Sequence, residues 1–297
     1  PQVLNQVRNL EVKARGIVEG FISGMHKSPY HGFSVEFAEH RPYNPGDELR
    51  HIDWKVFAKT GRYHVKQYEE ETNLRQYVVL DTSSSMQYKH QNGITKLEYA
   101  SYLAAAFHYL MTLQRDATGL IGFDEKVHTY IPPKATSQHV RGLLSQLEQF
   151  VQKPDARKTG AATALHEVAE RITRRALVVV MTDLFENVGE HEELLRALKH
   201  LRHRKHEVLV FHILESGTER HFRFPDLPMV FRDMETGETL TLQPAQIRDA
   251  YTEAVSAFSE SFRRRCREFN IDFVELDTAT AYDKAMLHYL NKRRMLL

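Results

Sequence analysis

"VVLDTSSSMQYK", residues 78–89, places three apolar residues before Asp81 and sets Ser83 and Ser85 two residues apart behind it. A short apolar run that ends in polar residues is typical of a buried strand leading into a loop. In an open α/β sheet, the loops at the carboxyl ends of the strands form the ligand-binding crevice. If the rest of the chain forms such a sheet, Asp81, Ser83 and Ser85 lie where a ligand binds.

The chain after residue 75 has the pattern of such a sheet. Short, nearly continuous runs of Val, Leu and Ile alternate with segments of helical periodicity. Such strands are expected when helices cover both faces of a mainly parallel sheet, so we predict a doubly wound α/β fold. The predicted strands are 76–81, 118–123, 126–131 (closed by Pro132-Pro133), 176–183, 207–214 and 271–276, and the predicted helices lie near 95–113, 137–150, 163–175, 190–203, 244–266 and 280–292.

The first 75 residues have a different composition. Residues 1–24 carry apolar side chains at helical spacing, whereas 28–75 is rich in Pro, Gly, aromatic and charged residues. We therefore predict two regions: 1–75, an N-terminal helix with an irregular and β segment, and 76–297, the α/β domain with a β-hairpin insertion at 225–243. Trp54, the sole tryptophan, is expected to anchor a core.

Composition limits the classes of partner. The 297 residues include 40 basic and 39 acidic side chains, and a net charge of +1 gives no general attraction to nucleic acid or to an anionic membrane. Cys266 is the single cysteine, which excludes an intramolecular disulfide and a cysteine-rich zinc site. The apolar runs are far shorter than the roughly 20 residues of a membrane span. We expect a cytoplasmic protein that neither spans a membrane nor binds nucleic acid.

Two more oxygen-bearing residues are expected at the same edge of the sheet. Asp183 ends the predicted strand 176–183, and Thr163 lies where the loop before the next helix enters its first turn. Together with Asp81, Ser83 and Ser85 they provide two carboxylates and three hydroxyls. Mg²⁺ prefers about six oxygen ligands at roughly 2.0–2.1 Å and tends to keep waters. The set therefore predicts a Mg²⁺ site with an open position, and Mn²⁺ or Ca²⁺ are alternatives.

These residues carry a resemblance to a known family. Asp81-x-Ser83-x-Ser85, followed by Thr163 and Asp183, resembles the metal-ion-dependent adhesion site of von Willebrand factor type A domains. The stretch "SPYHGFSVEFAEHRPYNPGDELRHIDWKVFAKTGRYHVKQYEEETN" is similar to the segment that precedes the A-type domain in a bacterial family catalogued as domain of unknown function 58. Members of that family are typically encoded beside MoxR-type AAA ATPases. The resemblance covers residues 5–290, and the chain resembles the form without membrane spans.

The resemblance implies a role for each residue. Ser83 and Ser85 would bind the metal directly, and Asp81 would bind it directly or through water. Thr163 and Asp183 would change between direct and water-mediated contact, with Thr159 as the alternative to Thr163. An acidic side chain of a protein partner would complete the shell. The implied partner is a MoxR-type ATPase or a client that the ATPase remodels.

Enzyme motifs are missing from the sequence. It contains no phosphate-binding G-x-x-x-x-G-K-[ST] loop, no G-x-S-x-G nucleophile elbow and no H-E-x-x-H zinc motif. A phosphotransferase of the haloacid dehalogenase type needs an acid/base aspartate two residues after the first, where this chain has Ser83. We expect a non-enzymatic interaction module, with a metal-dependent hydrolase or phosphatase as the alternative and a metal-free scaffold as a third hypothesis.

Overall fold

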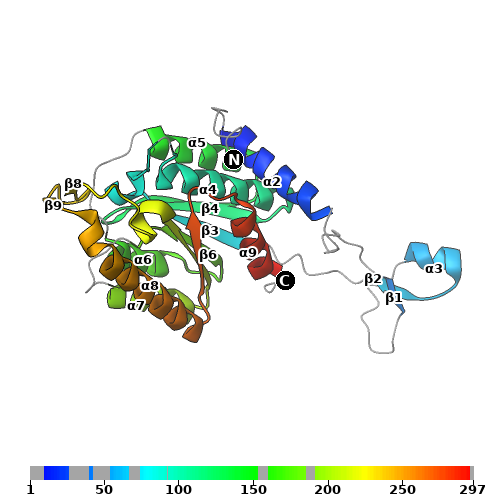
Figure 1. Cartoon of the computed structure of the whole chain (residues 1–297). Helices are drawn as coiled ribbons and strands as arrows, with labels where there is room; N and C mark the ends of the chain where they lie inside the picture. Colours follow the sequence, from blue (N-terminus) through cyan, green and yellow to red (C-terminus); the bar gives the residue numbers. More distant parts are fainter. Residues whose placement is uncertain are drawn as a thin grey trace. The chain divides into compact units, whose positions relative to one another are not determined.

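The structure, a computed structural model, describes residues 10–26, 40–42, 54–66, 74–91, 93–152, 160–184 and 191–294 (Figure 1). The chain divides into two compact units. Residues 24–73 form one unit, and the other combines the chain before Gly24 with the chain from Leu74 onward. Within the described ranges, none of the helices is both long enough and apolar enough to cross a membrane.

A central sheet organises the larger unit. The described residues form six strands in the spatial order β10-β7-β6-β3-β4-β5, and every neighbouring pair is parallel except β4 with β5. The mainly parallel α/β prediction is therefore confirmed. The strands are β3 (Arg75–Asp81), β4 (Ala117–Phe123), β5 (Val127–Lys134), β6 (Leu177–Thr182), β7 (Glu207–Leu214) and β10 (Asp272–Asp277).

Helices cover both faces of this sheet (Figure 1). One face carries α2 (Leu10–His26), α4 (Lys96–Leu113), α5 (Ser137–Gln152) and α9 (Asp283–Arg294), and the other carries α6 (Ala161–Arg171), α7 (His191–His203) and α8 (Pro244–Glu268). Alternate residues of β3 therefore pack into different layers. Val79 belongs to the core with α6, α7 and α8, whereas on the opposite face Phe107 of α4 stacks on Phe211 and on Tyr289 of α9.

The boundaries of β5 and α6 differ from those predicted. β5 continues through Pro132-Pro133 to Lys134. It is the edge strand, so one side of it needs no main-chain donors, and proline is tolerated there. Helix α6 begins at Ala161 rather than near 163, which places Thr163 inside its first turn.

The N-terminal helix belongs to the larger unit, which corrects its predicted grouping with the irregular segment in 1–75. Residues Leu10, Ala14 and Ile17 of α2 are buried, and the main-chain N–H of Leu10 donates to Glu148 Oε1 of α5 over 3.2 Å. The Lys13 ammonium lies 3.8 Å from the centre of the Tyr102 ring of α4. An amphipathic helix is stable only where its apolar stripe meets an apolar surface, and α4 and α5 provide that surface.

The smaller unit, residues 24–73, contains a two-stranded antiparallel sheet and a short helix. Strand β1 (His40–Pro42) pairs with β2 (His64–Lys66), and α3 spans Trp54–Thr60. The predicted role of Trp54 as a core anchor is wrong, because its side chain is 60% exposed. Phe57 stacks on Tyr63 at 4.4 Å, and Trp54 contacts only the edge of Phe57 at 6.1 Å among the ring contacts of the described residues.

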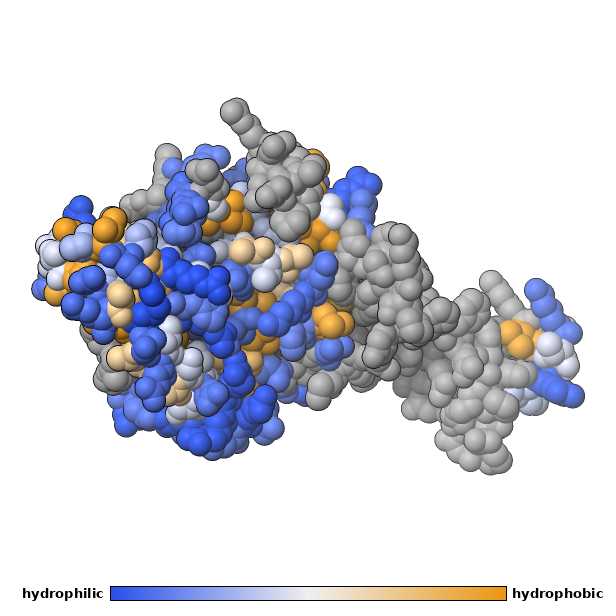
Figure 2. Space-filling view, in the orientation of Figure 1, coloured by the Kyte–Doolittle hydropathy of each residue, from blue (hydrophilic) through white to orange (hydrophobic). Residues whose placement is uncertain are grey.

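A β-hairpin lies within residues 225–243. Strands β8 (Met229–Arg232) and β9 (Thr239–Leu242) are antiparallel, and Gly237 in the turn between them adopts a φ of +75°. Phe222 stacks on Phe231 of β8 at 5.6 Å, which attaches the hairpin to the rest of the unit. Val230 and Leu240 stay 66% and 62% exposed, and hydrophobic surface is visible at this end of the molecule in Figure 2.

Candidate metal centre

Asp81 lies at the topological switch point of the sheet. From β3 the chain proceeds to β4 on one side, whereas β6, which follows later, pairs on the other side of β3. Open α/β sheets bind ligands where the strand order reverses in this way, which here is at the carboxyl ends of β3 and β6. Asp81 is the last residue of β3, and Asp183 directly follows β6. The topology therefore brings both predicted carboxylates to one edge.

The Asp81 carboxylate is completely buried and held on both oxygens. Oδ1 accepts a hydrogen bond from the main-chain N–H of Ser83 over 3.0 Å, and Oδ2 accepts one from the Thr182 hydroxyl over 2.6 Å. The Thr182 hydroxyl in turn accepts from the N–H of Leu184 over 3.2 Å. Thr182 was missed in the sequence, where the only available signal is its position before Asp183.

The two serines meet behind Asp81. Ser83 Oγ and Ser85 Oγ are 3.1 Å apart, one hydroxyl donating to the other, and both residues are buried. Two adjacent ligands on Mg²⁺, each about 2.0–2.1 Å from the ion, would be about 2.9 Å apart. The spacing of the hydroxyl oxygens is close to that value. The loop is fixed here because Met86, in the 3₁₀ helix η2 (Ser84–Gln87), is fully buried.

Thr82 turns away from this pair and ties the loop to the neighbouring strand. Its main-chain N–H and its hydroxyl both donate to the carbonyl oxygen of Phe123, over 2.8 and 2.9 Å, and its Oγ1 lies 2.8 Å from His128 Nε2. Residues 81–85 therefore alternate: Asp81, Ser83 and Ser85 are brought together, and Thr82 anchors the loop from the other side. The alternation explains why the oxygen donors occur at every second position.

Asp183 pairs with a side chain that the sequence did not single out. Its Oδ2 accepts a hydrogen bond from Lys96 Nζ over 2.7 Å, and both side chains are 1% exposed. Its main-chain carbonyl accepts from His212 Nε2 over 2.9 Å. Lys96 also forms an ion pair with Glu219 over 2.5 Å. A buried ammonium therefore lies beside the candidate cation site.

Burial and charge change the ionisation of these groups. Burial, followed by the charge of Asp183, raises the pKa of Asp81 to about 7, although hydrogen bonds from Thr182 and Ser83 act in the opposite direction. Burial alone would lower the pKa of Lys96, but the charges of Asp183 and Glu219 outweigh it and raise that pKa. Burial also raises the pKa of Glu219. Burial therefore favours the protonated forms of Asp81 and Glu219, whereas Lys96 is held in its charged form.

Thr163 is not joined by a hydrogen bond to the other four predicted residues in the described part of the chain. It is the third residue of α6, and its side chain is exposed. The alternative, Thr159, lies outside the described residues. The role of Thr163 as a metal ligand stays a prediction.

The start of α6 is fixed at the same edge of the sheet. The N–H of Gly160 donates to the carbonyl of Asp124, directly after β4, over 3.1 Å. A Cβ at Gly160 would lie 2.9 Å from the carbonyl oxygen of Glu125, so only glycine allows this approach. The first turn of α6, with Thr163, therefore begins beside the end of β4.

The donor set fits a hard cation. Hydroxyl and carboxylate oxygens are the ligands that Mg²⁺, Mn²⁺ and Ca²⁺ prefer. Within the described part of the chain, no three or more His, Cys, Asp and Glu side chains are arranged to hold a metal. A cation here would therefore depend on the Ser83 and Ser85 hydroxyls and on water as well as on Asp81.

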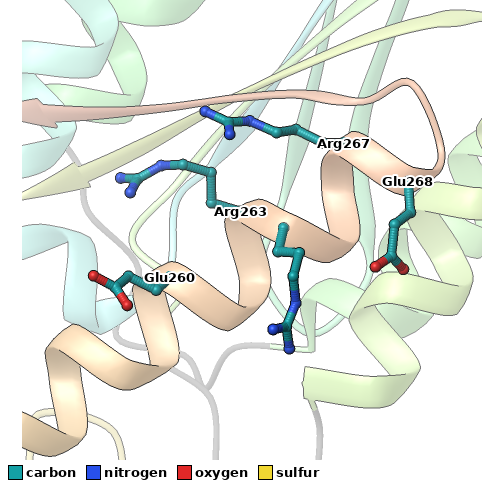
Figure 3. Close-up of a pocket in the computed structure, with 5 residues that line it drawn as sticks. Glu260, Arg263, Arg267 and Glu268 are labelled. Atoms are coloured by element: carbon teal, nitrogen blue, oxygen red, sulfur yellow. The ribbon is translucent and has the colours of Figure 1, made fainter.

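A separate hollow runs along α8 and has a different character. Its lining, all from this helix, is Glu260, Arg263, Arg264, Arg267 and Glu268, as Figure 3 shows. The charges are mixed, and Arg263 already pairs with Glu275. None of the predicted site residues lines this hollow. We therefore place the candidate site at the carboxyl ends of β3 and β6.

Fold and topology define the class of protein: a doubly wound α/β protein of the von Willebrand factor A-like type. The fold is similar to that of BatB from Bacteroides thetaiotaomicron, with a TM-score of 0.50 and 17% identity over 74% of this chain and 98% of BatB. The chain belongs to the family described as "Protein of unknown function DUF58", which matches residues 39–261.

Relatives cover almost the whole chain. Uncharacterized proteins of Mycobacterium bovis and Mycobacterium tuberculosis are 26% identical over 99% of this chain and 90% of theirs. An aerotolerance-related membrane protein from Bacteroides fragilis has a TM-score of 0.47 and 19% identity over 74% of this chain and 99% of that protein.

Proposed function

We propose that this protein is a non-enzymatic, metal-dependent protein-interaction module. Ser83, Ser85 and Asp81 would hold Mg²⁺, with Asp183 and Thr163 completing the protein ligands directly or through water. An acidic side chain of the partner would take the last coordination position. The family resemblance suggests a MoxR-type AAA ATPase, or a client of that ATPase, as the partner, so that ATP hydrolysis and binding reside on different chains.

One observation carries this proposal: two buried serine hydroxyls 3.1 Å apart, beside the buried carboxylate of Asp81 at the switch point. Buried hydroxyls are usually satisfied by main-chain groups. Here the two hydroxyls face each other at about the separation of adjacent metal ligands, beside a carboxylate that is buried near the charge of Asp183. A hard divalent cation would satisfy all three groups.

Binding is favoured over hydrolysis by the chemistry of the loop. The position two residues after Asp81, where a phosphotransferase needs a general acid, is Ser83. The basic side chain that contacts Asp183, Lys96, is engaged with Asp183 and Glu219. The alternative function, a metal-dependent hydrolase or phosphatase, would use the same cation to polarise a phosphate or water. It predicts turnover of an isolated phosphate ester that is lost in Asp81→Ala.

The metal site is tested by calorimetric titration of Mg²⁺, Mn²⁺ and Ca²⁺ into the wild type and two alanine variants. Ser83→Ala removes a proposed ligand. Ser84→Ala removes the neighbouring hydroxyl of the same serine run and is the matched control. We expect saturable binding to the wild type and Ser84→Ala, and at least tenfold weaker binding to Ser83→Ala. Equal binding to all three proteins would reject the site.

The interaction role is tested by capture of a purified MoxR-type ATPase from the same organism. We expect capture in Mg²⁺, loss of capture with chelator or with Ser83→Ala, and no hydrolysis of p-nitrophenyl phosphate by the chain alone. Hydrolysis that requires Asp81 would favour the hydrolase instead. Capture that persists in chelator would show that the ATPase binds independently of the metal.

A further inference from the structure

We infer that Lys96 is an internal cation that competes with the metal for Asp183 and thereby sets the affinity of the site. This inference rests on the proposed metal site. The ammonium of Lys96 would keep the Asp183 carboxylate from binding the metal directly. The metal would therefore keep a water molecule on the side that faces Asp183. Removing the ammonium would free Asp183 to bind the metal directly.

The position of Lys96 is unfavourable without these carboxylates. It is the first residue of α4, directly after the cap residue Thr95, and its side chain is 1% exposed. Lysine is almost never buried unless it is paired. The amino end of a helix carries partial positive charge, which repels an ammonium. Both effects must be offset by the carboxylates that Lys96 contacts.

Two carboxylates from distant parts of the chain converge on this ammonium. Nζ lies 2.7 Å from Asp183 Oδ2, at the end of β6, and 2.5 Å from Glu219 Oε1, in the π-helix η3 (Ser216–Arg220). Glu219 is held from its other side, because its Oε2 accepts from the N–H of Glu215 over 2.7 Å. The Tyr251 hydroxyl also donates to the Glu219 carbonyl over 2.8 Å. Lys96 therefore lies between two fixed acceptors.

The charge of the cluster matches a divalent cation only when Lys96 is counted. Asp81, Asp183 and Glu219 are three carboxylates, and Lys96 is the ammonium that pairs with two of them. Fully ionised, the cluster carries two excess negative charges, which one Mg²⁺ neutralises. Without Lys96 the cluster would carry three negative charges. Charges interact more strongly in a buried site of low dielectric constant than in water. A cation would then bind more tightly.

The hydrogen bond from Lys96 to Asp183 also affects how well Asp183 can bind a metal. A carboxylate oxygen that accepts a charge-assisted hydrogen bond at 2.7 Å is a poorer metal ligand, because the ammonium withdraws the same electron density. The hydroxyls of Ser83 and Ser85 contact each other, so they would stay in position for the metal. The wild-type site is thus expected to be weak, reversible and rich in coordinated water, and a partner carboxylate would add the missing strong ligand.

The test compares the wild type with Lys96→Met, which keeps the length of the side chain and removes its charge. Lys134→Met, at the exposed end of β5, makes the same charge change elsewhere and is the matched control. Mn²⁺ is titrated into each protein by calorimetry, and water-proton relaxation measures the waters left on the bound ion. We expect Lys96→Met to bind Mn²⁺ at least tenfold more tightly with fewer bound waters, and Lys134→Met to behave as the wild type.

The outcomes separate this inference from the proposed function. Binding by neither the wild type nor Lys96→Met would reject the metal site itself. Equal affinity and equal water content in the two proteins would keep the site and overturn the role of Lys96. Weaker binding by Lys96→Met would overturn it too, because Lys96 would then support coordination rather than compete with it.

A second variant covers the case in which Lys96→Met does not fold without metal. Glu219→Gln keeps Lys96 but removes one of its two carboxylates, so the ammonium binds Asp183 more strongly. We expect Mn²⁺ affinity at least threefold below that of the wild type. Unchanged or increased affinity in Glu219→Gln would contradict the competition.

Discussion

The Asp81 carboxylate is fully buried at the edge of the sheet, near the carboxylate of Asp183. This environment changes the pKa of Asp81. Burial, followed by the charge of Asp183, raises its pKa from the ordinary value of 3.8 to about 7. The protonated carboxyl is therefore favoured by folding, and the ionised form needs a cation to compensate it. The ionisation of Asp81 is therefore expected to affect both the stability of the protein at a given pH and the binding of a cation.

Stability without metal should depend on pH through Asp81. Below pH 3.8 both folded and unfolded states hold the proton; between 3.8 and about 7 only the folded state does, so stability falls as pH rises through this window. Asp81→Asn removes that loss. We expect Asp81→Asn to unfold at a higher temperature than the wild type at pH 8, with the difference shrinking toward pH 4. Thermal denaturation in chelator at pH 4 to 8 measures it, and a constant difference across this range would contradict the assignment.

Helix α4 starts with a capping box that also positions Lys96. The Thr95 hydroxyl accepts from the N–H of Glu98 over 3.0 Å, and the Glu98 carboxylate accepts from the N–H of Thr95 over 2.8 Å. These reciprocal bonds satisfy two main-chain donors at the helix start. Because Lys96 follows immediately, the cap fixes the direction from which its side chain reaches Asp183.

Loss of this cap should destabilise the protein. Thr95→Ala is expected to lower the free energy of unfolding by about 1 kcal/mol, because two N–H groups lose their acceptor or its support. Thr95→Ser keeps the hydroxyl and should lose less than half of that. Urea denaturation followed by circular dichroism compares the three proteins. Equal loss in both variants would assign the effect to the methyl group of Thr95 rather than to the cap.

Replacement of glycine by alanine should have opposite effects on stability at Gly119 and at Gly142. In β4, a Cβ at Gly119 would lie 2.6 Å from the carbonyl oxygen of Ile131 in β5, whereas Gly142 in α5 has no atom within 4 Å of the corresponding position. Gly119→Ala should destabilise by about 1 to 3 kcal/mol through main-chain displacement. Gly142→Ala should stabilise by about 0.5 to 1 kcal/mol through helix propensity. Urea denaturation of both variants measures the signs, and like signs would contradict the packing described for β4 and β5.

The larger unit is discontinuous in sequence, because α2 packs with the chain from Leu74 onward although residues 24–73 form a separate unit. Helix α2 buries the side chains of Leu10, Ile17 and Val18 within the larger unit. Each such side chain contributes about 1.5 to 3 kcal/mol. The α/β fold therefore depends on residues that a division at residue 75 would remove.

Two deletions test this organisation. A chain that begins at residue 74 should lose at least about 10 °C in Tm, because the surface under α2 becomes exposed. A chain in which a Gly/Ser linker of equal length replaces residues 28–70 should keep the Tm of the α/β unit. Calorimetric melting of both proteins gives the answer. If the linker variant melts as low as the truncated chain, the two units are not separate.

Local sequence patterns are enough to predict the class of fold and to place four candidate site residues at one edge of the sheet. Continuous apolar runs identify parallel strands, and a polar residue at the end of each run marks the edge, so Asp81, Ser83, Ser85 and Asp183 could be assigned to one place. These signals are local, since strand burial and strand ends depend on neighbouring residues. The Thr163 assignment depended on the predicted start of a helix, and its role as a ligand stays a prediction.

The surroundings of those residues depend on contacts between segments that are distant in the sequence. Lys96 and Glu219 lie in segments that read as an ordinary helix start and a loop, and they meet Asp183 because the strand order brings the ends of β6 and β7 together. The placement of α2 and the exposure of Trp54 likewise depend on which apolar surfaces are available. Contacts between distant segments leave no periodic trace in either segment. The charge balance of the site is therefore a property of the folded chain.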